Sequence, residues 1–363
     1  MKKILQRLFR SPLTWLANQI SAAPKKDAIF LSLNKLIQNI QTEHKDATIL
    51  PFDIATARFI IFSDHHKGVR DLADDFRLAE KNYSQALQYY NEQQFTLIAL
   101  GDCEELWENT PADVMEKNRT VLLKELAFLN ENRYYRVFGN HDLEWKYTIQ
   151  QSLYLKPVFG DQIKICEAVY LYTVVNGETY RILLTHGHQG DQRSDGNAFS
   201  KWFVAAIWTP IQRFFEIYMD TISDHFDLVD KHNIIFYEWS AAQKNLVLIT
   251  GHTHKPVFAS LDHFERLAQL VQHAEEKQDT AAANLWKAAL EKRKKEYAGK
   301  KILKTMAKPS YFNSGCCCFN DGDITGIEIS EGMIRLIKWE EKEGVSIRRV
   351  LEEAELQFVL QQL

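Results

Sequence analysis

The sequence predicts an α/β fold, a layered domain in which crossover connections join neighbouring strands. Five short apolar runs each end in polar, chemically useful residues, which is typical of strands buried on both faces. Amphipathic helical patterns separate the first three runs, and the order strand, helix, strand, helix, strand indicates crossovers. A length of 363 residues fits one large domain with insertions or two ordinary ones, and we prefer the first.

The expected strands and helices follow one another along most of the chain. Apolar positions from Phe76 to Tyr90 recur at helical spacing, and a second helix is expected around residues 114–129. Near the end, residues 323–330 and 333–340 flank a turn-like Glu-Gly pair and predict a terminal β-hairpin. The five strand-like runs are ARFIIF (57–62), FTLIAL (95–100), YYRVF (134–138), RILLT (181–185) and LVLIT (246–250).

Composition excludes several classes of protein. Hydrophobic residues at 45% and charged residues at 25% exclude wholesale disorder. A net charge of −4 gives no general basic footprint, which disfavours nucleic-acid binding. The five cysteines suit neither a disulfide framework nor a CxxC zinc site, so we interpret them as reduced, mostly buried thiols of a cytoplasmic protein. Metal binding by the run Cys316, Cys317 and Cys318 is the alternative.

The chain is expected to divide into an N-terminal helical segment, 1–50, and a main domain, 51–363. The first segment carries six Lys or Arg before its first acid, Asp27, and has apolar residues at helical spacing. It is either an interfacial helix on the inner face of an anionic membrane or a helix packed on the domain itself. No apolar run reaches the length of about 20 residues that a membrane span needs. Two helical insertions are predicted in the main domain, an aromatic one at about 197–244 and a charged one at about 262–305.

The motifs at the strand ends are rich in oxygen and imidazole donors. They read SDHHKG, GDCEELWE, GNHD, THGHQGD and GHTH. Because residues i and i+2 of an extended segment share a face, Asp64 and His66 can reach one site together, as can His252 and His254. The carboxyl edge of an α/β sheet is where such groups converge. The donor types suit borderline divalent cations such as Mn²⁺, Fe²⁺ and Zn²⁺.

These motifs, in this order, resemble those of the calcineurin-like metallophosphoesterases over roughly residues 57–260. The resemblance implies a four-layer αββα sandwich and two divalent metal ions, with Mn²⁺ as first choice and Fe or Zn²⁺ as alternatives. It implies hydrolysis of a phosphate ester, by a phosphatase or phosphodiesterase, through in-line attack of a metal-bridging hydroxide. One ion would be held by Asp64, His66, Asp102 and His254, and the other by Asp102, Asn140, His186 and His252, with Asp102 bridging.

The resemblance also implies two catalytic residues. His141 matches the histidine that protonates the leaving oxygen or stabilises its charge. Glu105 matches the carboxylate that orients this histidine, although many members have Asp there. His65 and His188 match no ligand position and are either polar contacts of the substrate or structural residues. Asp142 and Asp191 either orient ligands or are turn residues.

The motifs do not specify the ester, so several substrates stay open. The aromatic insertion between His186 and His252 is similar in place to the helical lid of UDP-diacylglucosamine pyrophosphohydrolases, which suggests a lipid-linked substrate and a peripheral membrane contact. Those enzymes typically have Arg where this chain has His141, so the lipid enzyme ranks below a general phosphoesterase. A nuclease and a non-catalytic scaffold on the same fold are further alternatives.

Overall fold

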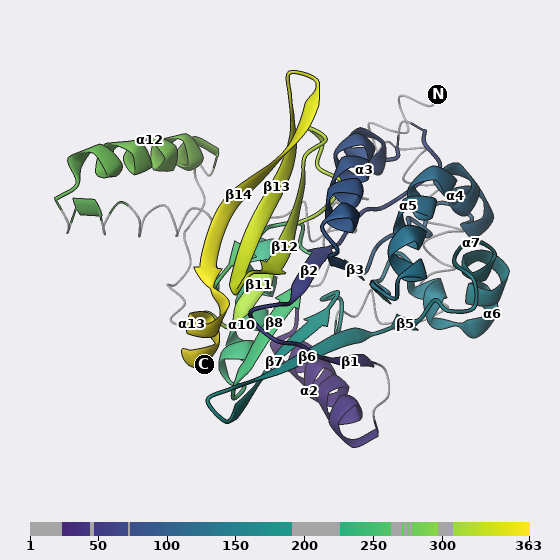
Figure 1. Cartoon of the computed structure of the whole chain (residues 1–363), viewed down its shortest axis with the longest axis horizontal. Helices are drawn as coiled ribbons and strands as arrows, with labels where there is room; N and C mark the ends of the chain where they lie inside the picture. The colour runs from purple at the N-terminus through teal and green to yellow at the C-terminus, as the bar shows by residue number, and fades with distance from the viewer. Residues whose placement is uncertain are drawn as a thin grey trace, which may run out of the picture.

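In the computed structural model, two seven-stranded sheets stack face to face, and helices cover both outer faces (Figure 1). The structure describes residues 24–43, 47–71, 73–190, 226–262, 271, 274–275, 278–296 and 308–363. None of the helices in these ranges combines the length and apolarity of a membrane-spanning helix. Because two stacked sheets lie between two layers of helices, the predicted four-layer αββα sandwich is confirmed.

The first sheet carries three of the motif-bearing strands, β2, β3 and β4, and ends in a long antiparallel ribbon. β2, β3, β4 and β5 pair in parallel, whereas β12 joins β2 antiparallel and continues through β13 to β14. In spatial order its strands are β14 (Val345–Glu355), β13 (Met333–Lys342), β12 (Ile324–Ser330), β2 (Arg58–Phe62), β3 (Thr96–Leu100), β4 (Tyr134–Val137) and β5 (Ile165–Cys166).

The second sheet carries the two remaining motif-bearing strands, β7 and β8, side by side and in parallel. In spatial order its strands are β1 (Ala47–Pro51), β6 (Ala168–Val175), β7 (Glu178–Thr185), β8 (Leu246–Thr250), β11 (Tyr311–Asn313), β9 (Val257–Phe258) and β10 (Leu261–Asp262). All five strands expected from the apolar runs are thus present, and so is the terminal hairpin of β12 and β13.

Successive side chains of a strand point to opposite faces of its sheet, so each strand contributes to two packed layers. Ile61 faces the other sheet and packs in the central layer, whereas its neighbours Ile60 and Phe62 pack against helices. These helices are the two predicted from their patterns, with the second split in two, and a set of short turns that follows β4. They are α3 (Phe76–Glu92), α4 (Pro111–Lys117), α5 (Arg119–Asn130), η1 (Leu143–Lys146), α6 (Thr148–Gln150), η2 (Gln151–Leu155) and α7 (Lys156–Phe159).

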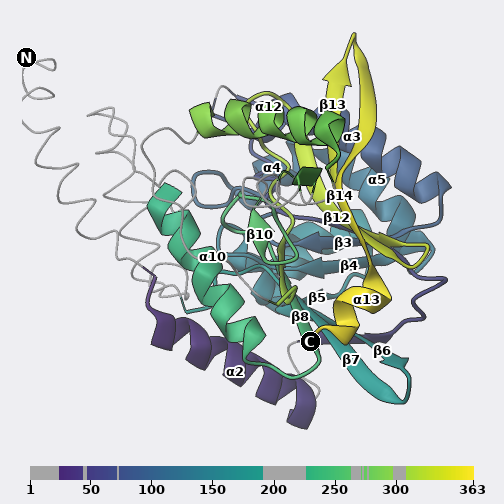
Figure 2. The same ribbon diagram turned by 90° about the vertical axis from the view of Figure 1, so that its left-hand side faces the viewer.

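Two helices cover the outer face of the second sheet, α2 (Lys26–Glu43) and α10 (Phe226–Ala241), and they lie against one another (Figure 2). α2 lies in the segment expected to be helical, but the last residues of that segment belong to β1 (Ala47–Pro51), whose Thr48 and Ile49 are β-branched and pair with β6. α10 ends the expected aromatic insertion, and α12 (Thr280–Glu296) lies within the charged one. The expected membrane-interfacial helix and most of the aromatic insertion lie outside the described residues.

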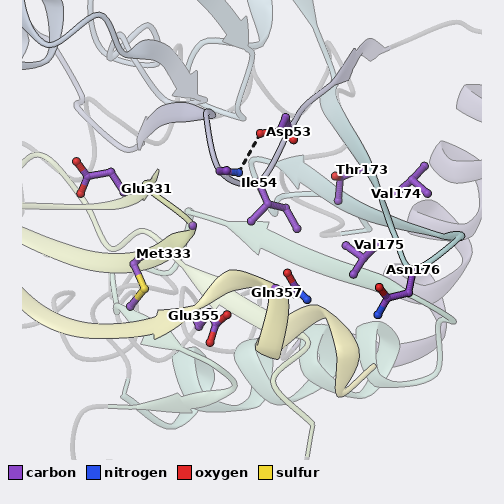
Figure 3. Close-up of a pocket in the computed structure, with 12 residues that line it drawn as sticks. Asp53, Ile54, Thr173, Val174, Val175, Asn176, Glu331, Met333, Glu355 and Gln357 are labelled. Atoms are coloured by element: carbon purple, nitrogen blue, oxygen red, sulfur yellow. Dashed lines mark hydrogen bonds between the residues drawn. The ribbon is translucent and has the colours of Figure 1, made fainter.

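A last helix, α13 (Leu356–Gln361), follows β14 and buries Leu356, Val359 and Leu360 in the central layer. Neither this helix nor β14 was expected from the sequence. Close to it, at the ends of the sheets away from the motifs, lies a groove of about 790 Å³ (Figure 3). Asp53, Thr173, Asn176 and Met333 are among the residues that line it, and no expected ligand does.

Candidate metal centre

The expected ligands converge where β2, β3, β7 and β8 end. Nε2 of His254 lies 3.2 Å from Oδ1 of Asp64 and 3.3 Å from Nε2 of His66. Oδ2 of Asp102 lies 3.1 Å from Nε2 of His186 and 3.8 Å from Nε2 of His66. Segments separated by almost 190 positions in the chain thereby share one small volume.

The remaining two expected ligands adjoin the same volume. Oδ1 of Asn140 lies 3.2 Å from Nε2 of His186. The ring of His252 is 5.2 Å from that of His186 between centroids, and Asp102, His186 and His252 form a buried group with donor atoms within 4.8 Å of one another. Asp64, His66 and Asp102 form a second group of this kind. The structure thus brings together all seven residues that the sequence selected.

Backbone conformation at the strand ends is unusual. Asp64, His66, Asp102, His252 and His254 all have φ between 49° and 66°, in the left-handed region. This region costs an L-residue about 1–2 kcal/mol, and such strain is characteristic of functional sites. Five of the seven expected ligands therefore have a strained backbone.

The donor set fits divalent cations. Nε2 of His252 is buried and has no hydrogen-bond partner among the described residues, an arrangement that a cation would satisfy. The other three imidazoles use Nδ1 for outer contacts: with Glu105 Oε2 (3.0 Å) for His66, with Leu100 O (3.0 Å) for His186, and with Cys318 Sγ (3.9 Å) for His254. Metal-bound histidines are usually held in this way, with the second nitrogen free for the ion.

Electrostatics favour the metal-binding form at two of the expected ligands, Asp102 and His252. Burial opposes ionisation of Asp102, but His186 and His141 outweigh burial and hold the pKa of this carboxyl well below its ordinary value. For His252, burial and the neighbouring His186 and His232 lower the pKa well below its ordinary value, so its imidazole stays neutral. An ionised carboxylate and a neutral imidazole are the forms that bind cations.

His141 lies beside this volume, at the rim. Its Nδ1 is 2.6 Å from Oε2 of Glu105, so the longer Glu side chain reaches the histidine directly. Burial would lower the pKa of His141, but Glu105 and Asp102 raise it to about 9. The backbone N of His141 donates to Oδ1 of Asp102 at 2.8 Å, which ties the histidine to the expected bridging carboxylate.

Of the other residues singled out in the sequence, the structure describes His65, Asp142 and His188. His65 is fully buried, its ring packs against Tyr83 and Phe76, and neither ring nitrogen has a hydrogen-bond partner among the described residues. Asp142 accepts hydrogen bonds from the backbone N of Cys103 (2.8 Å) and of Gly139 (2.6 Å), so it orients two ligand-bearing loops. His188 is buried beside His186, with 5.5 Å between ring centroids, and Asp191 lies outside the described residues.

Sequence reasoning missed three residues that contact the centre. Trp107 stacks on His141, Cys318 lies against His254, and His232 of α10 lies against His252, with 5.3 Å between ring centroids. Trp107 stands in a quoted motif, but tryptophan has no ligand chemistry that would have marked it. Cys318 belongs to the run of three cysteines that the sequence analysis interpreted as buried thiols, and His232 lies in a segment with no motif, so only the fold brings them to the site.

The chain is similar to one family of known proteins and to two solved structures. A family of calcineurin-like phosphoesterases matches residues 57–256, more than half of the chain. Among curated proteins there is no match. Two solved structures are similar: vacuolar protein sorting 29 from Cryptosporidium parvum, with 11% identity, a TM-score of 0.33 and coverage of 82% of this chain and 98% of the other, and a single-residue variant of Vps29 from Entamoeba histolytica, with 12% identity, a TM-score of 0.29 and coverage of 81% and 99%.

Proposed function

The chain belongs to the calcineurin-like phosphoesterase family, and from that membership we propose that it is a dinuclear metal-dependent phosphoesterase. The observation that carries the proposal is the convergence of seven donor residues from both sheets, together with the buried, unpartnered Nε2 of His252. His141 at the rim supplies a group for the leaving oxygen. A scaffold would need neither this donor set nor the strained backbone that presents it.

In this proposal Asp64, His66, Asp102 and His254 hold one cation, and Asp102, Asn140, His186 and His252 hold the other, with Mn²⁺ as first choice. When bound, two such cations would lower the pKa of a shared water and neutralise charge on the phosphate oxygens. Glu105 holds His141 through Nδ1, so the Nε2 proton is directed to the oxygen that leaves phosphorus. Deep burial of Asp64, Asp102 and His186 limits the water around the reacting group.

The test combines metal content with turnover. The protein is loaded with Mn²⁺, Zn²⁺ or Fe²⁺, bound metal is measured by mass spectrometry, and hydrolysis is assayed with a simple phosphomonoester, a simple phosphodiester and UDP-diacylglucosamine. We expect His141→Ala to lower turnover by about 10²–10⁴-fold with metal content unchanged, and Asp102→Ala to lose both.

Two results would contradict the proposal. A protein that binds none of these cations would be a scaffold rather than an enzyme. If His141→Ala kept wild-type turnover, the metal centre would stand but the role of His141 in catalysis would be wrong.

A further inference from the structure

Trp107 contacts the surroundings of His141 in three ways. Its indole ring stacks on the imidazole, with ring centroids 3.9 Å apart and planes inclined by 16°. Its Nε1 donates to the carbonyl oxygen of Asn140 at 2.8 Å, and its backbone N donates to Oε1 of Glu105 at 3.1 Å. One residue therefore supports the ring of His141, the peptide before it and its carboxylate partner.

The other contacts of His141 leave a single polar atom uncommitted. Its backbone N donates to Asp102 and its carbonyl oxygen accepts from the backbone N of Leu106 at 3.1 Å. Nδ1 is engaged by Glu105, and the ring of His66 meets the imidazole edge to face at 4.6 Å. Nε2 makes no hydrogen bond to any residue that the structure describes, and the side chain is 18% exposed. Nε2 is thus the atom that the site presents.

A proton donor held so firmly matters for only some phosphate esters. When the P–O bond breaks, its electron pair moves to the leaving oxygen. An aliphatic alkoxide is strongly basic and leaves slowly unless it receives a proton, whereas a nitrophenolate or a phosphate released from an anhydride is weakly basic and leaves unaided. A fixed donor therefore accelerates cleavage of esters of aliphatic alcohols most.

We propose that Trp107 is a positioning residue that holds Nε2 of His141 towards the leaving oxygen, and that the substrate is a phosphate ester of an aliphatic alcohol. The inference rests on the proposed function. In the step, the oxygen of water bonds to phosphorus and its proton passes to solvent. The ester P–O bond breaks, Nε2 of His141 protonates the leaving oxygen, and the histidine regains a proton from solvent.

The test measures how rate depends on the leaving group. Mn²⁺-loaded wild type, His141→Ala, Trp107→Leu and Trp107→Phe are compared on esters of 4-nitrophenol, phenol and an aliphatic alcohol, and on a nucleoside diphosphate anhydride. We expect Trp107→Leu to lose about 10–100-fold in kcat on the aliphatic ester, and less than about threefold on the nitrophenyl ester. Trp107→Phe keeps a stacking ring and should recover most of the loss.

The leaving-group series distinguishes positioning by Trp107 from a merely structural role. A structural role predicts equal losses on all esters, as does an effect on metal content, and either result would overturn the positioning role. If His141→Ala also lost equally on all esters, the proposed function of His141 would fail instead. Faster cleavage of the anhydride than of the aliphatic ester by wild type, with His141→Ala unaffected on the anhydride, would overturn the substrate class.

Discussion

Gly139→Ala tests how closely the loops that bear the candidate ligands approach each other. A Cβ atom at Gly139 would overlap Oδ1 of Asp102 and lie 2.6 Å from the backbone N of Asp102. Gly139 is not among the residues with positive φ, so the effect of the methyl group is steric rather than conformational. Ordinary contact begins at 3.4 Å, so one loop must move by about 0.8 Å, the difference between 3.4 and 2.6 Å.

A shift of this size acts on the centre itself, because Asp102 also accepts from the backbone N of His141. We expect Gly139→Ala to lose about 1–3 kcal/mol of stability, as overpacking does, and about 10²-fold in turnover, as a misplacement of about 1 Å can. Urea unfolding measures the first effect, and bound metal and hydrolysis of a simple ester measure the second.

The control is Gly344→Ala in the turn between β13 and β14. Gly344 has a φ of 83° and no atom within 4 Å of a Cβ, so alanine there should cost about 1–2 kcal/mol and leave metal content and turnover unchanged. If Gly139→Ala kept full metal content and wild-type turnover, the loops would not be as closely fitted as these distances indicate.

Two further predictions concern groups beneath and beside the centre. Lys67 is fully buried 2.8 Å from Glu125 and 3.4 Å from Glu104, so Lys67→Met should lower the free energy of unfolding in urea by about 3–5 kcal/mol. The control, Lys81→Met at the exposed pair with Glu341, should cost about 0–1 kcal/mol, and equal costs would show that the buried pairs add nothing. Cys318→Ala removes the contact with Nδ1 of His254 and should weaken metal affinity about 10–100-fold in a competition titration. The control is Cys317→Ala, whose side chain packs in the helix-covered core, and a similar loss of affinity there would refute a specific role for Cys318.

The strand-end motifs made much of the fold and the site predictable. Each motif follows an apolar run that can only be buried, so the carboxyl edge of the sheets and the donors placed there follow from the sequence. β14 was missed because its sequence, VSIRRVLEEAE, alternates weakly and is only half-buried along its length. β1 was missed because five residues that follow a helix carry little periodicity of their own.

Contacts between distant segments could not be predicted in this way. The stack of Trp107 on His141 joins the segments that follow β3 and β4, and nothing in the local sequence of either segment encodes it. The buried group of Lys67, Glu104, Glu125 and Arg136 joins β4, α5 and two ligand loops, yet each residue alone is typical of a protein surface. Only the packed layers determine which charges are buried together.

A segment beyond the family match, which ends at residue 256, is hydrogen-bonded to the backbone at two of the expected ligands with positive φ, Asp64 and His252. Nδ2 of Asn313 donates to the carbonyl oxygen of Gly251 at 2.7 Å, and the backbone N of Ser314 donates to the carbonyl oxygen of Thr250 at 2.9 Å. The backbone N of Cys317 donates to the carbonyl oxygen of Asp64 at 3.1 Å. One short loop thus ties the Asp64 and His252 segments together and resists the relaxation of their backbone. Residues 313–318 are therefore as much a part of the centre as the motifs that mark it in the sequence.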